Sequence, residues 1–315
     1  MMGNIKEDKQ KIDVQQMINE KKSTQNNLKI IEKIVPVFLF LCAALSILTT
    51  VGILFTLLRE SITFFGEQGF FSFITGTKWN PWAGDFGVLP LITGTLQITV
   101  ISILVALPIG LASAIFLSEY ASDKVRRTIK PTLEVLAGVP TVVYGYFAVS
   151  FVTPILRSIF PEIGIFNALS AGLVVGIMIV PMIASLSEDA MNSVPTSLRE
   201  GALALGSTRL EVALKVVVPA AFSGIVAATV LAISRAIGET MIVTIAAGAS
   251  PNLTFDPLVS IQTLTAFIVQ GIKGDTTFGS MIYYSVYAVG MTLFVFTLAM
   301  NLLSQYIARK FREEY

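Results

Sequence analysis

Six long apolar stretches, separated by polar segments, dominate this chain. A helix that crosses a hydrocarbon core of about 30 Å needs about 20 predominantly apolar residues, and each stretch is long enough. Charged side chains occur only in the third stretch, at Glu134, and in the fifth, at Arg235 and Glu239. The pattern therefore predicts an all-α membrane protein with six transmembrane helices. The predicted spans are residues 34-58, 89-117, 131-156, 163-186, 216-248 and 281-307.

Composition narrows the class of function. Hydrophobic residues make up 54% of the 315 positions and charged residues 14%, against about 25% charged in soluble domains. The chain has no histidine and one cysteine, which removes the commonest general base and metal ligand and any disulfide within the chain. It also lacks a phosphate-cradling GxxxxGK(S/T) sequence. We therefore expect no catalytic residue, no bound metal or cofactor and no nucleic acid partner, which leaves transport as the leading function.

Lys and Arg are distributed unevenly between the segments that connect the spans. The N-tail 1-33, segment 118-130, loop 187-215 and the C-tail 308-315 carry 17 of the 22 Lys and Arg residues. The alternate segments carry four. Because positively charged loops stay on the cytoplasmic side of a membrane, both tails and loop 187-215 are predicted to lie in the cytoplasm. The protein is then a multi-pass protein of the cytoplasmic membrane, surrounded by lipid.

The polar loop between the fourth and fifth spans contains two helix-start signals in tandem. Ser197-x-x-Glu200 and Thr208-x-x-Glu211 both match a capping box, in which the hydroxyl accepts from an amide of the first turn and the carboxylate reaches back. Gly206 lies between them, where a helix stop is expected. The loop is predicted to fold as a helix-turn-helix on the membrane surface, suited to being held by a partner.

Two charges in the fifth span are the first candidates for a role in transport. Arg235 and Glu239 are four residues apart, which places them on one face of a continuous helix. A charge at the bilayer centre costs roughly 2.5–3.5 kcal/mol on insertion scales, so such residues face a bundle interior or a water-filled cavity. The pair either neutralises itself and fixes packing, or forms an oxyanion site or gate, since a guanidinium matches phosphate oxygens in two-bonded geometry. Thr240, next to Glu239, is a further candidate.

The third span has two special positions. Glu134 follows Pro131, and because a carboxylate near a helix N-terminus is stabilising, we expect it to cap the helix. Pro140 breaks the backbone hydrogen bonds of the same helix. Thr141, beside it, either lines a transport route or packs against a neighbour.

Other segments concern packing and the predicted outer side. Gly172-x-x-x-Gly176 in the fourth span allows a neighbouring helix to approach closely, and we interpret it as a packing motif. The outer segments 59-88 and 249-280 are rich in Gly, Asn, Asp, Thr and Phe. They either dock a partner or fold over the helix ends.

The polar loop also resembles the EAA signature of binding-protein-dependent ABC importer permeases, which reads Glu-Ala-Ala, three residues, Gly, nine residues, then Ile-x-Leu-Pro. Here the pattern is Glu200-Gly201-Ala202, Gly206 and Val216-x-Val218-Pro219, with every spacing kept. Four further stretches are similar to the phosphate importers within this family, the PstC permeases. They are KWNPWAGDFGVLPLITGTL (78-96), LPIGLASAIFLSEYA (107-121), AGVPTVVYGYFA (137-148) and SRAIGETMIVTIAAG (234-248).

The resemblance implies a fold, partners and residue roles. The fold is the MetI-like fold of type I ABC importers. The partners are a sister permease (PstA), two ATPase subunits (PstB) that bind ATP and Mg, and an extracytoplasmic phosphate-binding protein (PstS). Transport-critical charges fall on Arg235 and Glu239, to which we add Thr240 and Thr141. Contact with the ATPase falls on Arg199, Glu200, Gly201, Ala202, Leu205 and Gly206.

The expected function is that of a permease subunit, itself not an enzyme, that conducts inorganic phosphate inward under the drive of partner ATPases. Another oxyanion, such as phosphonate, sulfate or molybdate, is an alternative substrate. Two alternatives come from other classes: a secondary transporter or channel that needs no ATP, and a membrane scaffold with no pathway.

Overall fold

The computed structural model describes residues 3–274 and 276–310, and side chains from residue 32 to 306 with the exception of 275 and 304. Residues 1–2 of the predicted N-tail and 311–315 of the predicted C-tail lie outside this part. The chain divides into two compact units, Met1–Thr56 and Leu57–Tyr315.

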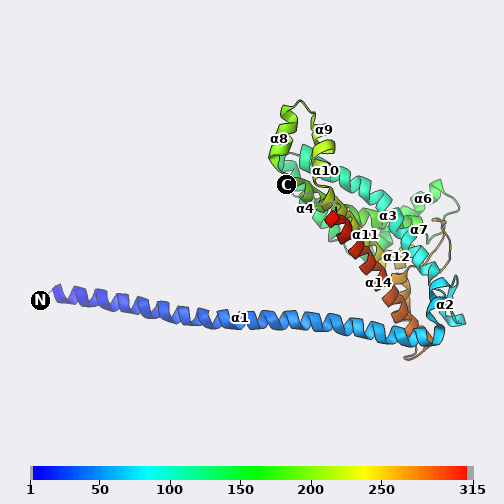
Figure 1. Cartoon of the computed structure of the whole chain (residues 1–315), viewed down its shortest axis with the longest axis horizontal. Coiled ribbons are helices and arrows are strands. Elements are labelled where there is room, and N and C mark those ends of the chain that lie inside the picture. Colours follow the sequence, from blue (N-terminus) through cyan, green and yellow to red (C-terminus); the bar gives the residue numbers. More distant parts are fainter. Residues whose placement is uncertain (1–2, 275, 311–315) are drawn as a thin grey trace. The chain divides into compact units, whose positions relative to one another are not determined.

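A single helix makes up the described part of the first unit. α1, Gly3–Gln68, runs without a break through the predicted N-tail and first span, and its last twelve residues belong to the second unit (Figure 1). Pro36 lies inside it, although a proline removes one backbone hydrogen bond of the ladder. The stretch long and apolar enough to cross a membrane is Glu32–Gln68, which contains the predicted span.

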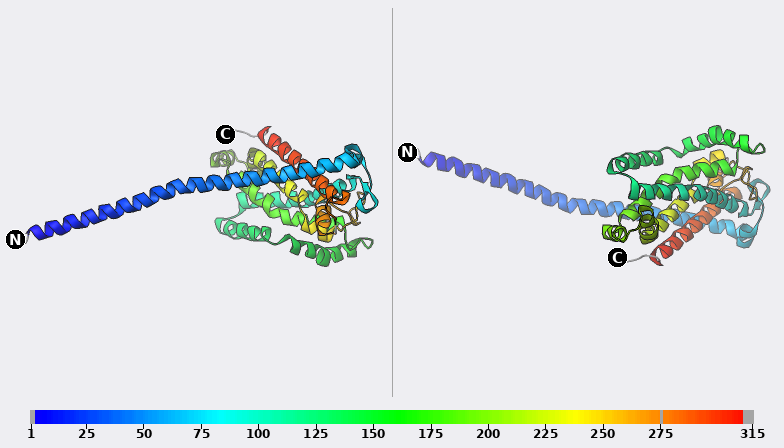
Figure 2. Two further views of the ribbon diagram at one scale, coloured as in Figure 1. Left: turned by 90° about the horizontal axis from the view of Figure 1, so that it is seen from below. Right: turned by 90° about the horizontal axis from the view of Figure 1, so that it is seen from above.

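The centre of the second unit is the pair α3, Leu89–Ile115, and α7, Ala168–Asn192, which lie side by side (Figure 2). At Gly172 an added Cβ would come within 2.6 Å of Ile101, and at Gly176 within 2.9 Å of the Ser102 carbonyl oxygen. The Ser102 hydroxyl donates to the carbonyl of Gly172 at 3.0 Å. These contacts need glycine because the backbones touch, so the predicted packing motif is confirmed.

The remaining helices pack around this pair. The main apolar core combines side chains of α3 and α7 with those of α11 and α12. α11 also packs on α14, α12 on α5, and α13 on α14. Their bounds are α5 Thr141–Phe147, α11 Phe222–Ile237, α12 Met241–Ala246, α13 Leu264–Lys273 and α14 Met281–Lys310.

The predicted third span, 131-156, is wrong as a single helix. Residues 131–137 belong to a separate amphipathic helix, α4, Asp123–Ala137, and the chain breaks at Gly138 to Pro140. Proline disfavours helical geometry in the residue before it, so the crossing segment starts at Thr141 and ends at Ile159. It consists of α5, a π-helical turn Ala148–Val152 and α6 Thr153–Ile159. Glu134 lies at the end of α4, not at a helix start, so its predicted capping role is also wrong.

The predicted fifth span, 216-248, is wrong as a straight helix. A first arm, Arg209–Ala220, is made of α9 Arg209–Val212, a π-helical turn Ala213–Val217 and α10 Val218–Ala220. The chain then bends by 73° into α11, and α12 follows after a second break. Among the described residues, five helices are long and apolar enough to cross a membrane, or six when this bent pair counts as one span.

A small β-hairpin interrupts the all-α pattern between α1 and α3. After α2, Phe70–Thr75, strand β1, Trp79–Asn80, pairs antiparallel with β2, Asp85–Phe86. The aromatic rings of this segment form edge-to-face contacts, and the Trp79 ring lies 4.7 Å from that of Phe267 in α13. The two segments predicted to be on the outer side therefore fold over the helix ends and share one core.

Candidate functional site

Arg235 and Glu239 lie on either side of a helix break. α11 ends at Ile237, Gly238 follows as its C-terminal cap, and α12 begins at Met241. The prediction that the two charges share one face of a continuous helix is therefore wrong. No ion pair joins them within the described part of the chain.

Glu239 closes the start of α12. Its side chain is 7% exposed, and its Oε1 accepts hydrogen bonds from the amides of Met241, at 3.0 Å, and Ile242, at 3.1 Å. Amides of a first helical turn have no partner within the helix, and the helix dipole favours a negative charge there. The hydroxyl of Thr265 also donates to the Glu239 carbonyl oxygen at 2.7 Å. The break is thus capped by Glu239 and held against α13.

Arg235, by contrast, is exposed. Its Nη2 approaches the Met178 sulfur of α7 at 3.9 Å, a weak contact for a full charge. Arg235 belongs to an exposed stripe on α11 that also contains Ala227 and Leu231. A guanidinium on an otherwise apolar helix is too costly to leave against lipid. This face of α11 therefore requires either water or another protein surface.

The two candidate threonines are positioned separately. Thr240 donates to the Gly238 carbonyl oxygen at 3.0 Å and so belongs to the break beside Glu239. Thr141 is half-buried at the start of α5. In the described residues, no hydrogen bond or ion pair connects either hydroxyl to Arg235. No cluster of three His, Cys, Asp or Glu residues that could hold a metal occurs in the described residues.

The polar loop folds as the predicted helix-turn-helix, α8, Thr196–Ala204, followed by α9. We call Thr196–Val212 the coupling hairpin, after the role that the EAA resemblance implies for it. Gly206 has a φ of 89° and donates to Leu203, while the next amide, of Ser207, donates to Ala202; this left-handed stop is one that glycine adopts readily.

One of the two capping boxes is confirmed. Thr208 and Glu211 bond each other's backbone amides at 3.3 and 3.0 Å. The box at Ser197 and Glu200 is wrong, since Pro195 precedes α8 and no side chain caps that helix.

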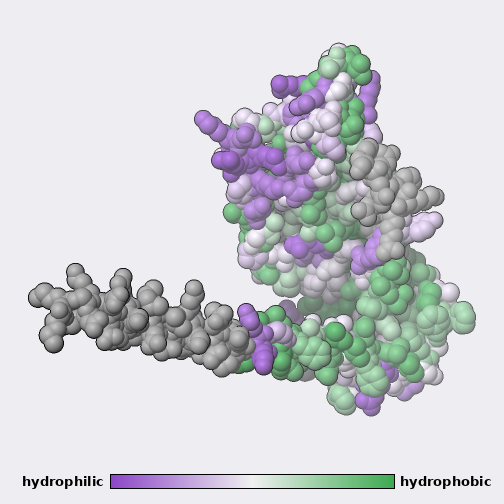
Figure 3. Space-filling model, turned by 60° about the vertical axis from the view of Figure 1, so that its left-hand side comes forward, coloured by the Kyte–Doolittle hydropathy of each residue, from purple (hydrophilic) through white to green (hydrophobic). Residues whose placement is uncertain are grey.

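The turn of the coupling hairpin presents an apolar surface. Leu205 is 89% exposed, Leu203 and Leu210 are about half exposed, and Glu200 and Gly201 are exposed beside them. Figure 3 shows this hydrophobic surface at the top of the view, with hydrophilic surface nearby. Ala202 instead packs partly into the core at the hairpin's base.

Arg199 points inward, away from this surface. Its guanidinium pairs with Glu119, at the end of the π-helical turn that continues α3, at 3.2 Å. It also donates at 2.6 Å to the carbonyls of Met191, in the last turn of α7, and of Val194, just beyond that helix. Arg199 therefore joins the coupling hairpin to two helices of the bundle.

An ion cluster that the sequence interpretation missed lies nearby. Glu188 of α7 is fully buried, and its carboxylate pairs with Arg126 at 2.5 Å and Lys130 at 2.8 Å, both on α4. Lys130 also binds the exposed Asp189 at 2.7 Å. Burial lowers the pKa of Lys130, but the hydrogen bonds to Asp189 and Glu188 raise it more, so the net pKa lies above its ordinary value. A signal was present: two cations four residues apart precede two carboxylates at the end of an apolar run.

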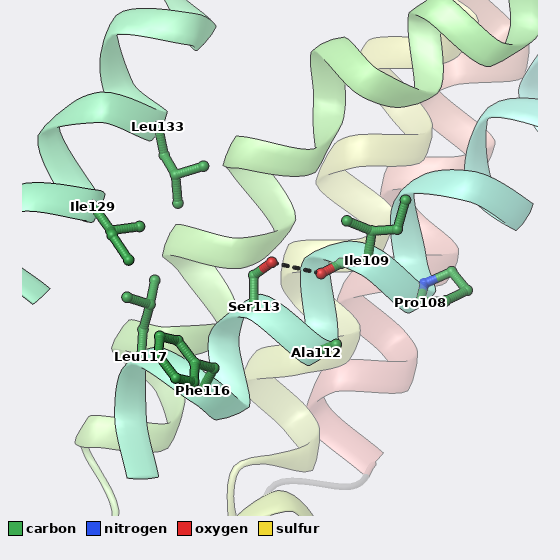
Figure 4. A pocket seen from close by; sticks show the side chains of 8 residues that line it. All are labelled: Pro108, Ile109, Ala112, Ser113, Phe116, Leu117, Ile129 and Leu133. Atoms are coloured by element: carbon green, nitrogen blue, oxygen red, sulfur yellow. Dashed lines mark hydrogen bonds between the residues drawn. The ribbon is translucent and has the colours of Figure 1, made fainter. Parts of the chain in front are cut away.

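An apolar groove of about 570 Å³ separates α3 from α4. Figure 4 shows Ile129 and Leu133 of α4 facing Leu117 across it. The hydroxyl of Ser113 already donates to the Ile109 carbonyl oxygen at 2.8 Å. None of the residues that line the groove is charged, so it offers an oxyanion no charged donor.

Comparison with known proteins decides the family. Residues 106–313 match the model for the binding-protein-dependent transport system inner membrane component. The chain belongs to this family. As such a component, it is an ABC importer permease and a multi-pass inner membrane protein.

Relatives of this inner membrane component are known from several bacteria. A probable ABC transporter permease of Bacillus subtilis, YqgH, is 37% identical over 85% of this chain and 88% of its own length. The phosphate transport system permease PstC of Mesorhizobium japonicum is 34% identical over 75% and 78%. The PstC of Haemophilus influenzae is 33% identical over 81% and 84%.

Solved structures confirm the fold. A chain of a bacterial alginate ABC transporter, in complex with its alginate-bound periplasmic protein, matches 87% of this chain and 96% of its own length, with a TM-score of 0.61 and 17% identity. A chain of the inward-facing MetNI methionine ABC transporter matches 75% and 100%, with a TM-score of 0.56 and 18% identity. The inner membrane component therefore has the predicted MetI-like permease fold.

Proposed function

We propose that this chain is a permease subunit that conducts inorganic phosphate into the cytoplasm, driven by ATP hydrolysis on partner subunits. The observation that carries the proposal is Arg235: an exposed guanidinium, without an ion pair among the described residues, on an apolar helix. Arg stays charged and binds tetrahedral oxyanions with two parallel hydrogen bonds. The relatives named as phosphate transport permeases support phosphate as that oxyanion.

In this proposal, the exposed stripe of α11 faces a sister permease of the PstA type, with the pathway between the two subunits. Arg235 meets phosphate there. Glu239 and Thr240 shape the break that follows Arg235, and Thr141 contributes a hydroxyl from α5. The charge is then satisfied by water and substrate instead of lipid.

Energy comes from two ATPase subunits of the PstB type, which bind ATP and Mg. They hold the coupling hairpin through Leu205 and the exposed Glu200, Gly201 and Gly206, while Arg199 and Ala202 anchor the hairpin to the bundle. An extracytoplasmic binding protein of the PstS type delivers phosphate at the opposite end. Because packed helices shift as rigid bodies, closure of the ATPase dimer opens and closes the pathway.

Reconstitution tests this proposal. The chain, its sister permease and the ATPase are co-expressed, purified and placed in liposomes with ATP at the ATPase side, and uptake of radiolabelled phosphate is measured with the binding protein outside. We expect uptake that requires ATP and the binding protein and resists competition by sulfate, molybdate and phosphonate. If one of these competitors is transported in preference to phosphate, that oxyanion is the substrate instead of phosphate. Uptake by the chain alone without ATP would establish a secondary transporter or channel instead.

A further inference from the structure

The buried carboxylate of Glu188 forms the only deeply buried attachment of α4 to the bundle. Within α4, all of whose residues are described, no side chain is buried, and Ile129 and Leu133 are only half-buried against the groove. Glu188 has no solvent-exposed surface and holds both Arg126 and Lys130. A buried charge is tolerated only when it is paired and hydrogen-bonded. Loss of the charge at Glu188 would therefore release α4.

The same carboxylate is connected to the coupling hairpin by further polar contacts. Asn192, one turn further along α7, donates to Glu188 at 2.8 Å and accepts from Ser118 at 3.4 Å. The single hydroxyl proton of Ser118 is shared between Asn192 and Glu119, whose Oε1 lies 2.9 Å from the Ser118 oxygen, and Glu119 pairs with Arg199 of α8 at 3.2 Å. We call this group the polar clamp. It consists of Arg126, Lys130, Glu188, Asn192, Ser118, Glu119 and Arg199.

The polar clamp joins four elements at one end of the bundle: α4, α7, the turn that ends α3, and α8. All its members lie within the second unit of the chain. An apolar set of similar volume often holds helices at least as tightly as buried charges do. Buried charges are therefore weak evidence for a role in stability, whereas directional contacts of this kind favour one relative position of the four elements.

We propose that Glu188 is a positioning residue that makes α4, the ends of α3 and α7, and the coupling hairpin move as one body. This inference rests on the proposed ATP-driven transport, because it concerns how motion of the ATPase reaches the helices. Without the polar clamp, the coupling hairpin would move with the ATPase, but α4 and the ends of α3 and α7 would not move with the hairpin. ATP would then be hydrolysed with less phosphate transported per ATP.

The test uses the full complex with its sister permease, ATPase and binding protein in liposomes. Glu188→Gln removes the buried charge and keeps the shape of the side chain. We expect this complex to assemble and hydrolyse ATP, while phosphate uptake per ATP falls by at least about fivefold, the low end of coupling between distant sites. A purely structural role would lower yield, hydrolysis and uptake together.

Asp189→Asn is the matched control. Asp189 binds the same Lys130 but is exposed, and exposed ion pairs contribute little. Uptake per ATP should therefore stay within about twofold of the wild type. A Glu188→Gln complex with wild-type uptake per ATP would overturn the inference.

Two further outcomes are distinguishable. If Glu188→Gln does not assemble, Arg126→Gln, which removes one half-exposed cation of the clamp, is measured in the same way; reduced uptake per ATP supports the inference, and an unchanged ratio overturns it. If the wild-type complex itself shows no ATP-dependent uptake, the proposed function fails, before any variant is compared.

Discussion

Arg235 and Glu239 are four residues apart in sequence, yet the Glu239 carboxylate accepts a hydrogen bond from the amide of Ile242, and Arg235 stays exposed on the other side of a helix break. A mutually neutralised pair would have needed no substrate and no partner. Because the two residues are separated, Glu239 has a structural role as a helix cap, and Arg235 remains available to bind an oxyanion.

Arg235→Gln should stop phosphate uptake while the complex still assembles. The change removes a charged, two-bonded donor, and a hydrogen bond to a charged group contributes about 1.5–3 kcal/mol, which corresponds to about tenfold or more in uptake. Arg235→Lys keeps the charge without the planar fork and should recover only part of it. Uptake of radiolabelled phosphate and yield of the purified complex are the measurements. Lys273→Gln, which removes another exposed cation, is the control, and normal uptake by Arg235→Gln would return this residue to a packing role.

Glu239→Ala should destabilise the complex more than Glu239→Gln does. Alanine leaves the amides of Met241 and Ile242 without the Oε1 acceptor, and loss of a helix cap costs about 0.5–2 kcal/mol. Glutamine retains one acceptor oxygen in the same place. Thermal unfolding of the purified complex, followed together with uptake, distinguishes the two. Loss of uptake in Glu239→Gln at unchanged thermal stability would show that the charge itself serves transport.

Gly206→Val should weaken attachment of the ATPase. An added Cβ meets no atom within 4 Å at this position, so the main effect comes from the backbone, whose φ of 89° costs an L-residue roughly 1–2 kcal/mol. The turn between α8 and α9 would then change shape. Gly84→Val is the control, since its φ of 84° and its open surroundings match those of Gly206, but it lies between β1 and β2, outside the coupling hairpin. The amount of ATPase pulled down should fall for Gly206→Val only. If both variants pull down as much ATPase as the wild type, the turn is not part of the interface.

Leu205→Asp should prevent the ATPase from binding without unfolding the permease. Leu205 is almost wholly exposed and contributes nothing to the core, whereas a buried aspartate without a partner is costly in an interface. Phe255→Asp, an equally exposed apolar position in the segment before α13, is the control. Pull-down yield and the melting temperature of the permease are measured together. A Leu205→Asp protein that binds the ATPase as well as the control does would place the contact elsewhere.

Local signals predicted local structure well. The Thr208–Glu211 capping box, the stop at Gly206 and the close approach at Gly172 and Gly176 each depend on a few neighbouring residues, and each is confirmed. The six apolar stretches also indicated the right fold class, because crossing a membrane requires length and hydrophobicity above all.

Pro140 predicted a loss of helix hydrogen bonds inside the third span, where the chain does break. The break inside the fifth span was not predicted, because tertiary contacts satisfy it. Gly238 to Thr240 looks like the middle of a helix in sequence, but Thr265, far along the chain, bonds the Glu239 carbonyl and Glu239 supplies the cap. The cluster at Glu188 was missed for a similar reason. The spaced cations Arg126 and Lys130 and the paired carboxylates Glu188 and Asp189 are visible in the sequence, but no local pattern shows that these two groups, about sixty positions apart, meet.

The 73° bend between Arg209–Ala220 and α11 sets the direction in which a push on the first arm acts on α11. A thrust along the shorter arm acts mostly crosswise on the longer one, as at an elbow. Small strokes of a motor at the hairpin would then swing Arg235 sideways instead of sliding it along its own axis.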